Sequence, residues 1–271
     1  VITQNTTLDS DVGPCPGDGI VIGASNITLD LAQFRVLGMG SPSSVGIRVR
    51  EPHHRVRITN GTVAGFDQDG VSVWTSDNVI DRLAVRGNGF RIALQGNRNN
   101  QVRGNVIIGN LVNGIVTRVS SDNTIETNVI AQTRLGDGIF IGGSVVLNGV
   151  VVPVSGNRVI GNSILNNARD GVLTSSTSAE IRGNSIRNNR GNGVFGITAN
   201  INLPQCCAVI HRNHIFGNGA NGVLVQGTNN TIVANTALAN RRFDLADANP
   251  ACDANIWTGN RFGTRNQPCI K

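Results

Sequence analysis

The sequence predicts an all-β solenoid, a single chain wound into about nine to ten stacked turns that we call rungs. One frame returns about every 22 to 25 residues: a Gly, a short Ile/Val strand, a polar bend, a second Ile/Val strand and an Asn. Its first half reads D-G-V-S-V at 69–73 and N-G-V-L-V at 221–225, and its second half reads V-R-G-N at 102–105. A fixed period of this size indicates a repeat fold, and the alternation of apolar residues favours strands over helices.

The residue that opens each frame marks where each predicted rung begins. Because the repeat is unbroken, we predict a single domain over residues 1–271. The rungs begin at Gly19, Gly46, Gly70, Arg91, Gly114, Gly138, Gly171, Gly193 and Gly222, with a degenerate last turn from Phe243. Because a solenoid leaves unpaired strands at both ends, we expect an N-terminal cap at 1–18, rungs at 19–249 and a C-terminal cap at 250–271.

The period of two within each strand divides the side chains between core and surface. The residue after each opening position, such as Ile47 or Val71, is expected to point inward. Asn residues at one corner are expected to stack into a ladder of amides: Asn105, Asn128, Asn162, Asn184, Asn213 and Asn235. The Asp or Asn before each opening Gly, such as Asp137 or Asp170, recurs too regularly for chemistry, and we expect it to cap a turn.

The composition favours an anionic partner. The net charge is +6 and Lys271 is the only lysine, so arginine carries nearly all the positive charge. Guanidinium groups bind carboxylates and sulfates bidentately, which makes an acidic polysaccharide a candidate partner, although a GC-rich genome explains the same bias. Nucleic acid is not expected, because no zinc-finger or RNP-like motif accompanies the charge. Membrane insertion is not expected, because no apolar run approaches the roughly 20 residues needed.

The cysteines bear on the compartment. Cys252 and Cys269 bracket a Gly/Asn-rich loop and are predicted to form a disulfide, which implies an oxidising compartment. Together with a chain that opens at Val1 without a signal peptide, this predicts a secreted, extracellular protein. The pairing of Cys15, Cys206 and Cys207 is left open by the sequence.

One outward column, four residues after the opening position, indicates a binding face. On rungs two to five it presents Arg50, Trp74, Gln95 and Arg118, about 5 Å apart in successive rungs. The Trp offers a flat face for a sugar, and the guanidiniums suit uronate carboxylates, with His53 in the loop beside them. The alternative is a Trp packed under a loop between solvated arginines.

A second outward column places Asp81, Arg103 and Glu126 on consecutive rungs. An Arg between two acids can neutralise a substrate carboxylate while one acid moves a proton, as a lyase or an epimerase requires. A surface ion-pair ladder explains the same residues. No metal site is expected, because His211 and His214 on one strand face opposite sides.

A third outward column is apolar from rung five onward. It contains Val116, Phe140, Leu173, Phe195 and Leu224. A solvated face should not be apolar over this length. We expect this stripe to be covered by insertions of the chain or by a second copy in a homo-oligomer.

Three stretches carry a resemblance to a known family. They are G-D-G-I-V-I-G-A-S-N-I-T-L-D-L at 17–31, the G-N-x-I and N-N-x-x-G-V repeats, and N-P-A-C-D-A-N-I-W-T-G-N-R-F at 249–262. With them the chain resembles, over nearly its whole length, the right-handed parallel β-helix proteins of the pectin-lyase-like superfamily, nearest to the NosD-like or carbohydrate-binding-and-hydrolysis repeat group. The resemblance implies a right-handed coil with a polysaccharide-facing groove outside one sheet.

The catalytic motifs of the superfamily's enzymes do not occur in the chain. The N-T-D, D-D and G-H-G motifs of polygalacturonases and the D-P-H motif of mannuronan epimerases are missing, and there is no Tyr for a His/Tyr pair. No cofactor is expected, with Ca²⁺ left open by the resemblance to pectate lyases. Two hypotheses follow. One is a secreted lyase or epimerase acting on a uronate glycan, and the other is a non-catalytic module that binds glycan or self-assembles.

Overall fold

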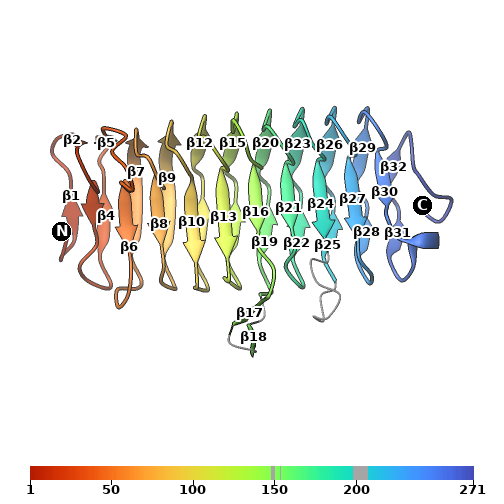
Figure 1. The fold of residues 1–271 in the computed structure, drawn as a ribbon, viewed down its shortest axis with the longest axis horizontal. Helices are drawn as coiled ribbons and strands as arrows, with labels where there is room; N and C mark the ends of the chain where they lie inside the picture. Colours follow the sequence, from red (N-terminus) through yellow and green to blue (C-terminus); the bar gives the residue numbers. More distant parts are fainter. Residues whose placement is uncertain (148–149, 153, 198–206) are drawn as a thin grey trace.

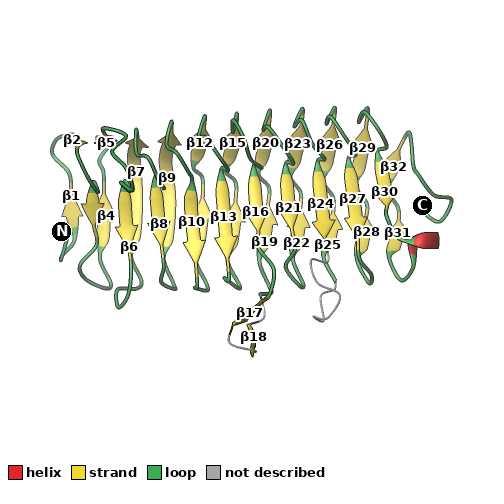
Figure 2. Cartoon of the chain, in the orientation of Figure 1, coloured by secondary structure: helices red, strands yellow, loops and turns green. Residues whose placement is uncertain are grey.

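The chain forms a parallel β-helix whose rungs stack along one long axis, with the two termini at opposite ends (Figure 1). The computed structural model describes residues 1–147, 150–152, 154–197 and 207–271. Nearly all of its regular structure is strand (Figure 2), and one short 3₁₀ helix, η1 (Pro250–Cys252), follows the last rung. The predicted all-β solenoid is confirmed.

A ten-stranded parallel sheet forms one side of the coil and lies at the front of Figure 1. Its strands are β3 (Ile20–Val21), β6 (Ile47–Val49), β8 (Val71–Val73), β10 (Ile92–Gln95), β13 (Ile115–Arg118), β16 (Ile139–Ile141), β21 (Val172–Thr174), β24 (Val194–Ile197), β27 (Val223–Gln226) and β30 (Leu245–Asp247). The first nine strands begin directly after the predicted opening residues. The expected count of nine to ten rungs is therefore confirmed.

A twenty-stranded parallel sheet forms the other sides of the coil as two limbs, and β7 (Arg57–Ala64) and β9 (Val79–Arg86) run through both. The first limb adds β1 (Thr6–Thr7), β4 (Thr28–Asp30), β11 (Gln101–Arg103), β14 (Thr124–Glu126), β19 (Arg158–Ile160), β22 (Glu180–Arg182), β25 (Val209–His211), β28 (Thr231–Val233) and β31 (Ile256–Thr258). The second limb adds β2 (Val12–Cys15), β5 (Arg35–Gly38), β12 (Val106–Ile108), β15 (Val129–Ala131), β20 (Ser163–Leu165), β23 (Ser185–Arg187), β26 (His214–Phe216), β29 (Thr236–Leu238) and β32 (Arg261–Phe262). A separate antiparallel hairpin, β17 (Val145–Leu147) and β18 (Val150–Val152), projects from the coil (Figure 1).

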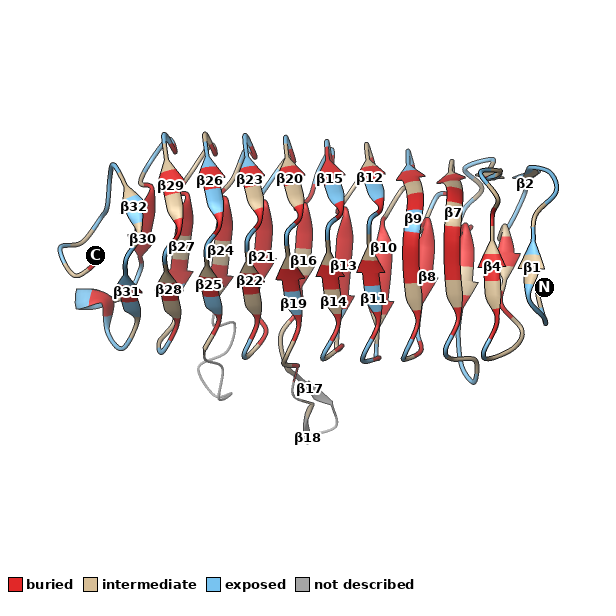
Figure 3. Ribbon diagram, turned by 180° about the vertical axis from the view of Figure 1, so that it is seen from behind, coloured by how far each residue is buried: buried red, intermediate tan, exposed pale blue. Residues whose placement is uncertain are grey.

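The inward columns form the core, as the period of two predicts. Ile47, Val71, Ile92 and Ile115 pair in register on consecutive strands of the ten-stranded sheet, and none is exposed to solvent. Buried positions alternate with more exposed ones along the strands of the twenty-stranded sheet (Figure 3). Because each pairing is residue for residue, side chains one rung apart lie side by side at the spacing of paired strands.

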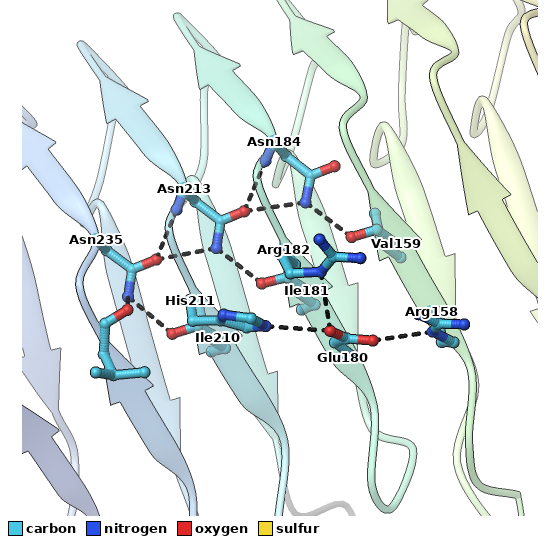
Figure 4. Close-up of polar contacts among 11 residues, drawn as sticks. Arg158, Val159, Glu180, Ile181, Arg182, Asn184, Ile210, His211, Asn213 and Asn235 are labelled. Atoms are coloured by element: carbon cyan, nitrogen blue, oxygen red, sulfur yellow. Dashed lines mark hydrogen bonds and ion pairs between the residues drawn. The ribbon is translucent and has the colours of Figure 1, made fainter.

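Asn side chains at the corner between the two limbs form the predicted amide ladder (Figure 4). Asn184 Oδ1 accepts hydrogen bonds from the backbone N–H and the Nδ2 of Asn162, at 2.8 and 3.0 Å. Asn184 Nδ2 donates to Val159 O at 2.9 Å and to Asn213 Oδ1 at 3.0 Å. The other two corners carry similar ladders, which include Asn78, Asn100, Asn123 and Asn157 at one corner and Asn167, Asn189, Asn218 and Asn240 at the other. Each ladder gives buried turn amides a partner that strand pairing does not supply.

The column that was expected to cap turns contains two adjacent buried carboxyl groups. Asp170 Oδ1 accepts from both the backbone N–H and the Nδ2 of Asn192. Asp137 Oδ1 accepts only the backbone N–H of Asp170, at 3.0 Å, because the second carboxylate has no amide to donate. Burial raises the pKa of Asp137 to about 6 and also raises the pKa of Asp170. The buried site therefore favours the protonated form of the Asp137 carboxyl group.

Both ends of the coil continue the sheets. β1 pairs with β4 and β2 with β5, so residues within 1–18 supply the first strands of the twenty-stranded sheet. At the other end, Cys252 and Cys269 form the predicted disulfide, with their Cα atoms 6.1 Å apart. Cys15 is a free thiol, and Cys207 is disulfide-bonded. Cys206 lies outside the described residues.

Replacing Asn184 with Ala tests the ladder. The change leaves the backbone N–H of Asn162 and the carbonyl of Val159 without the partners that Asn184 supplies, and it removes one of the acceptors of Asn162 Nδ2. Since each buried unsatisfied group costs about 1–3 kcal/mol, we expect the free energy of unfolding in urea to fall by about 3 kcal/mol or more. Gln101→Ala, which removes an exposed amide from the first limb, should change it by less than about 0.5 kcal/mol. Equal effects of the two variants would contradict the assigned role.

Replacing Asp137 with Asn tests the buried carboxyl group. The folded-state pKa of about 6 lies above the ordinary 3.8, so the wild type loses stability as the pH rises from about 4 through 6. Asn fits the same column at Asn192 and carries no charge. The variant should therefore be more stable than the wild type by up to about 3 kcal/mol at pH 7.5, and the difference should vanish near pH 4.

The same urea titrations should be repeated with Asp9→Asn as the control, because this change removes one negative charge from an exposed position. A constant difference between Asp137→Asn and the wild type across the pH range would overturn the assignment.

Candidate functional site

Three side chains on the outer face of the ten-stranded sheet line a surface pocket: Arg48, Arg50 and Trp74. Trp74 follows β8 and is 47% exposed, yet its ring is held in place because Nε1 donates to Ser72 Oγ at 3.1 Å. An exposed indole anchored at one end leaves a flat apolar surface available for a ligand. The expected position of Trp74 beside Arg50 is confirmed.

The pairing register continues this face along the coil. Gln95 pairs with Arg118, and the pairing of Leu94 with Val73 places Gln95 on the rung next to Trp74. The predicted column of Arg50, Trp74, Gln95 and Arg118 therefore lies on four consecutive rungs. We call the outer surface of these rungs the arginine face. Among the described residues, Arg50 and Arg118 make no ion pair and no side-chain hydrogen bond, so both guanidiniums are available to a ligand.

The midline of the arginine face is nearly inaccessible to solvent. Ser72, Ala93 and Val116 point outward between inward neighbours, yet they are only 2%, 7% and 1% exposed. Neighbouring side chains therefore cover the middle of these strands, as Trp74 does where it bonds to Ser72. His53 lies in the turn after Arg50, where its backbone N–H donates to Arg50 O at 3.1 Å, so this expected neighbour of the face is also adjacent to it.

Two carboxyl groups adjoin the arginine face. Asp18 accepts from Nε and Nη2 of Arg48 at 2.7 and 2.8 Å, and this hydrogen bonding lowers the pKa of Asp18. Asp69 is more deeply buried, and burial raises its pKa against the opposing effects of Arg91 and Ser72. Asp18 therefore neutralises Arg48. The remaining carboxyl group, that of Asp69, is a single negative charge beside three arginines, Arg50, Arg91 and Arg118.

The second predicted column is in register but lies on the first limb of the other sheet. Arg103 pairs with Asp81 on one side and with Glu126 on the other, as expected. The side chain of Asp81 is 6% exposed and binds Arg57 at 2.7 Å, with Arg103 at 3.7 Å. Although burial opposes it, hydrogen bonding from Arg57 and Thr59 lowers the pKa of Asp81. No hydrogen bond or ion pair among the described residues joins this column to the arginine face.

A charged cluster further along the first limb was not identified from the sequence (Figure 4). Glu180 accepts from Arg158 Nε at 2.9 Å and from Arg182 Nε at 3.0 Å, and its Oε1 lies 3.1 Å from His211 Nε2. Arg182 and His211 belong to the column that contains Arg103, but Arg158 and Glu180 belong to a neighbouring column of the same strands. Comparison of both columns across three rungs would have identified the cluster.

The apolar stripe is also in register, and most of it is covered within the single chain. Val116, Phe140, Leu173, Phe195 and Leu224 pair in succession. Val116 and Leu173 are buried and the other three are half-buried. The single chain thus leaves only part of this stripe available to a second copy.

The fold defines the class as a right-handed parallel β-helix protein, and a model of the right-handed β-helix region matches residues 149–238. The chain belongs to the NosD family, described as periplasmic copper-binding protein (NosD), whose model matches residues 3–193. No match was found among curated proteins.

Family membership and the disulfide place the protein outside the cytoplasm. No helix among the described residues is long and apolar enough to span a membrane.

Solved structures of low sequence identity share the fold. A mutant of the periplasmic alginate epimerase AlgG is 14% identical, with a TM-score of 0.60 over 93% of this chain and 70% of that one. The alginate lyase from Paenibacillus sp. str. FPU-7 is 15% identical, with a TM-score of 0.63 over 92% and 89%. The Dettilon tailspike protein is 18% identical, with a TM-score of 0.71 over 97% and 60%.

The described residues do not fit a copper site of the kind that the family description implies. No group of three or more His, Cys, Asp or Glu side chains lies close enough together in this part of the chain to hold a metal ion. His211 is engaged by Glu180, and Cys252 and Cys269 are joined to each other. We therefore derive no chemistry from copper, and the same residues offer no cluster for Ca²⁺.

Proposed function

We propose that the protein binds an acidic, uronate-rich polysaccharide along the arginine face. The observation that carries this proposal is the pocket of Arg48, Arg50 and Trp74, continued on the next two rungs by Gln95 and Arg118. An extended polymer matches a linear row of residues that repeats at the spacing of paired strands. The fold shared with an alginate epimerase and an alginate lyase supports this class of ligand, because alginate is an acidic polysaccharide.

The side chains of the arginine face suit each part of such a ligand. The indole of Trp74 offers a surface for the apolar side of a sugar ring, and Arg50 and Arg118 offer unpaired guanidiniums for carboxylates. The net charge of +6 attracts a polyanion from a distance, and added salt weakens this attraction. Secretion beyond the cell is part of the same proposal, since it would bring the protein to an extracellular polymer.

Binding of polygalacturonate and of neutral dextran, measured by isothermal titration calorimetry, tests the proposal. Wild type should bind polygalacturonate and not dextran. Trp74→Ala and the double variant Arg50→Ala/Arg118→Ala should each weaken binding about tenfold, the loss typical of truncating a central contact. The matched controls are Phe216→Ala, an exposed aromatic on the second limb, and Arg86→Ala at an exposed position there. Failure of the wild type to bind, or equal losses in the controls, would refute it.

Turnover of the glycan at Asp81, Arg103 and Glu126 is a second proposal, favoured by one observation. Glu126 makes no ion pair or side-chain hydrogen bond among the described residues, whereas Asp81 is held by Arg57. Glu126 would then be the group that accepts a proton from the sugar, Arg103 would neutralise the substrate carboxylate, and Asp81 would hold Arg103.

Two assays on polyuronates test turnover. A lyase would generate ultraviolet absorbance from new unsaturated ends, and an epimerase would incorporate solvent deuterium at the inverted carbon. Glu126→Gln should reduce the activity at least about a hundredfold and Arg103→Met should also reduce it, with Arg86→Met as the control. Activity that survives in both variants would exclude this column from the chemistry.

A further inference from the structure

The second limb presents no exposed carboxyl group among its described residues from rung four onward. Its strands there, β12, β15, β20, β23, β26, β29 and β32, contain no Asp or Glu. The turns that lead from these strands to the ten-stranded sheet contain Asp137, Asp170 and Asp244, which are only 3%, 7% and 2% exposed. On the first limb, by contrast, Glu126 and Glu180 are partly exposed. The two limbs therefore differ in surface charge.

Exposed arginines line the same turns. They are Arg134, Arg169, Arg190, Arg241 and Arg242, and we call this row the basic edge. It follows the upper edge of the coil in Figure 1, where β20, β23, β26 and β29 end, opposite the β17–β18 hairpin. Gly191 N–H donates to Arg169 O at 2.8 Å, and Arg242 N–H donates to Ala220 O at 2.9 Å, so backbone hydrogen bonds align the turns from rung to rung.

Most of the basic edge lacks counterions. Arg169 Nε lies 4.0 Å from the buried Asp137. The other four arginines make no ion pair and no side-chain hydrogen bond with any residue that the structure describes. Their guanidiniums are therefore available to an anionic partner, and a row of cations over five rungs matches an extended anionic surface.

Large apolar side chains are exposed beside these arginines (Figure 3). Val106, Val129 and Phe216 lie on the outer face of the second limb, and Leu111 and Leu135 lie in the turns of the basic edge. Leu135 is 63% exposed, and its N–H donates to Leu111 O at 2.9 Å, so the two leucines occupy neighbouring turns. Apolar side chains that gather on one surface, rather than singly, indicate an interaction site.

One surface pocket joins the two kinds of side chain. Leu111 and Arg134 line it together with three glycines, Asn88 and Asp67. Asp67 Oδ2 already accepts the backbone N–H of Ser43 at 3.0 Å, whereas Arg134 has no partner among the described residues. A cation and an exposed leucine thus meet in a single concave site at the start of the basic edge.

We propose that the second limb and the basic edge dock on a lipid membrane that contains anionic headgroups. Arginines bind phosphate oxygens bidentately, and Leu111 and Leu135 leave water for the boundary between the headgroups and the acyl chains. Negative lipid charge also attracts a row of arginines and repels the carboxyl groups of the first limb, which orients the coil. A soluble polyanion would use the arginines but would give the exposed leucines no apolar partner.

Flotation of the full chain with vesicles tests the proposal. Wild type should float with equimolar phosphatidylglycerol and phosphatidylcholine, and not with phosphatidylcholine alone. Arg241→Gln/Arg242→Gln should weaken binding about tenfold or more, because it removes two cations from the contact, and added salt should weaken wild-type binding. Leu135→Ser should weaken binding about fivefold, because an apolar contact with the lipid is lost.

Matched control variants keep the test specific. Arg98→Gln/Arg212→Gln removes the same charge from exposed positions at the other two corners, and Ile256→Ser removes an exposed apolar side chain from the first limb. Neither should change binding. Wild type that floats with neither vesicle, or equal losses in the controls, would overturn the inference. Full binding by Leu135→Ser beside a loss in the arginine variant would indicate a ligand for the charges alone and would also overturn it.

A tryptophan at Leu135 reports the position of the lipid. Neither native tryptophan lies on this surface, because Trp74 belongs to the arginine face and Trp257 is buried. Brominated acyl chains in phosphatidylglycerol vesicles should quench the added emission of Leu135→Trp and leave wild-type emission unchanged. Quenching of the wild type, or none in the variant, would contradict the proposed docking. The arginine face lies on the other sheet, so failure of polygalacturonate to bind would refute the proposed function and leave this result unchanged.

Discussion

The structure depends on residue-for-residue stacking of the rungs, and the Asn ladders hold this register at the turns. Strand pairing alone satisfies the backbone between corners, but each rung must also turn through three corners, where buried amides need other partners. Asn184 supplies them on both sides: its Oδ1 accepts from Asn162 on one neighbouring rung, and its Nδ2 donates to Val159 on that rung and to Asn213 on the other. Figure 4 shows the two bonds that Asn184 Nδ2 donates. A slip of one residue would break these bonds and turn the core columns outward. The surface columns are aligned only because this register is fixed.

The same register converts sequence spacing into a surface. Trp74, Gln95 and Arg118 are 21 and 23 residues apart in sequence, yet they occupy neighbouring rungs. The two sheets separate the charged residues into different groups. On the first limb Asp81 and Glu180 are each bound by arginines, whereas on the arginine face Arg50, Arg91 and Arg118 exceed the carboxyl groups available to them. That imbalance, rather than the total charge, makes the arginine face the better candidate for an anionic ligand.

The repeat made the coil, the inward columns, the Asn ladder and the Cys252–Cys269 disulfide predictable, because each follows from a fixed period or a short loop. It also predicted which outward residues become neighbours. It did not reveal that the side chain of Arg91 is buried, because the repeat shows only that Arg91 stands where other rungs have Gly. Nor does any single column show the cluster at Glu180, because Arg158 and Glu180 lie on one outward column and Arg182 and His211 lie on the next.

The most direct test uses the two tryptophans of the chain. Trp74 is half exposed on the arginine face, whereas Trp257 is buried near the C-terminal end and donates to Asp247 at 2.9 Å. Quenching of tryptophan emission by acrylamide therefore reports chiefly on Trp74. Saturating polygalacturonate should protect this emission from acrylamide, and the same mass of dextran should not. Unchanged quenching in the presence of the bound polymer would place the ligand on another surface and contradict the account.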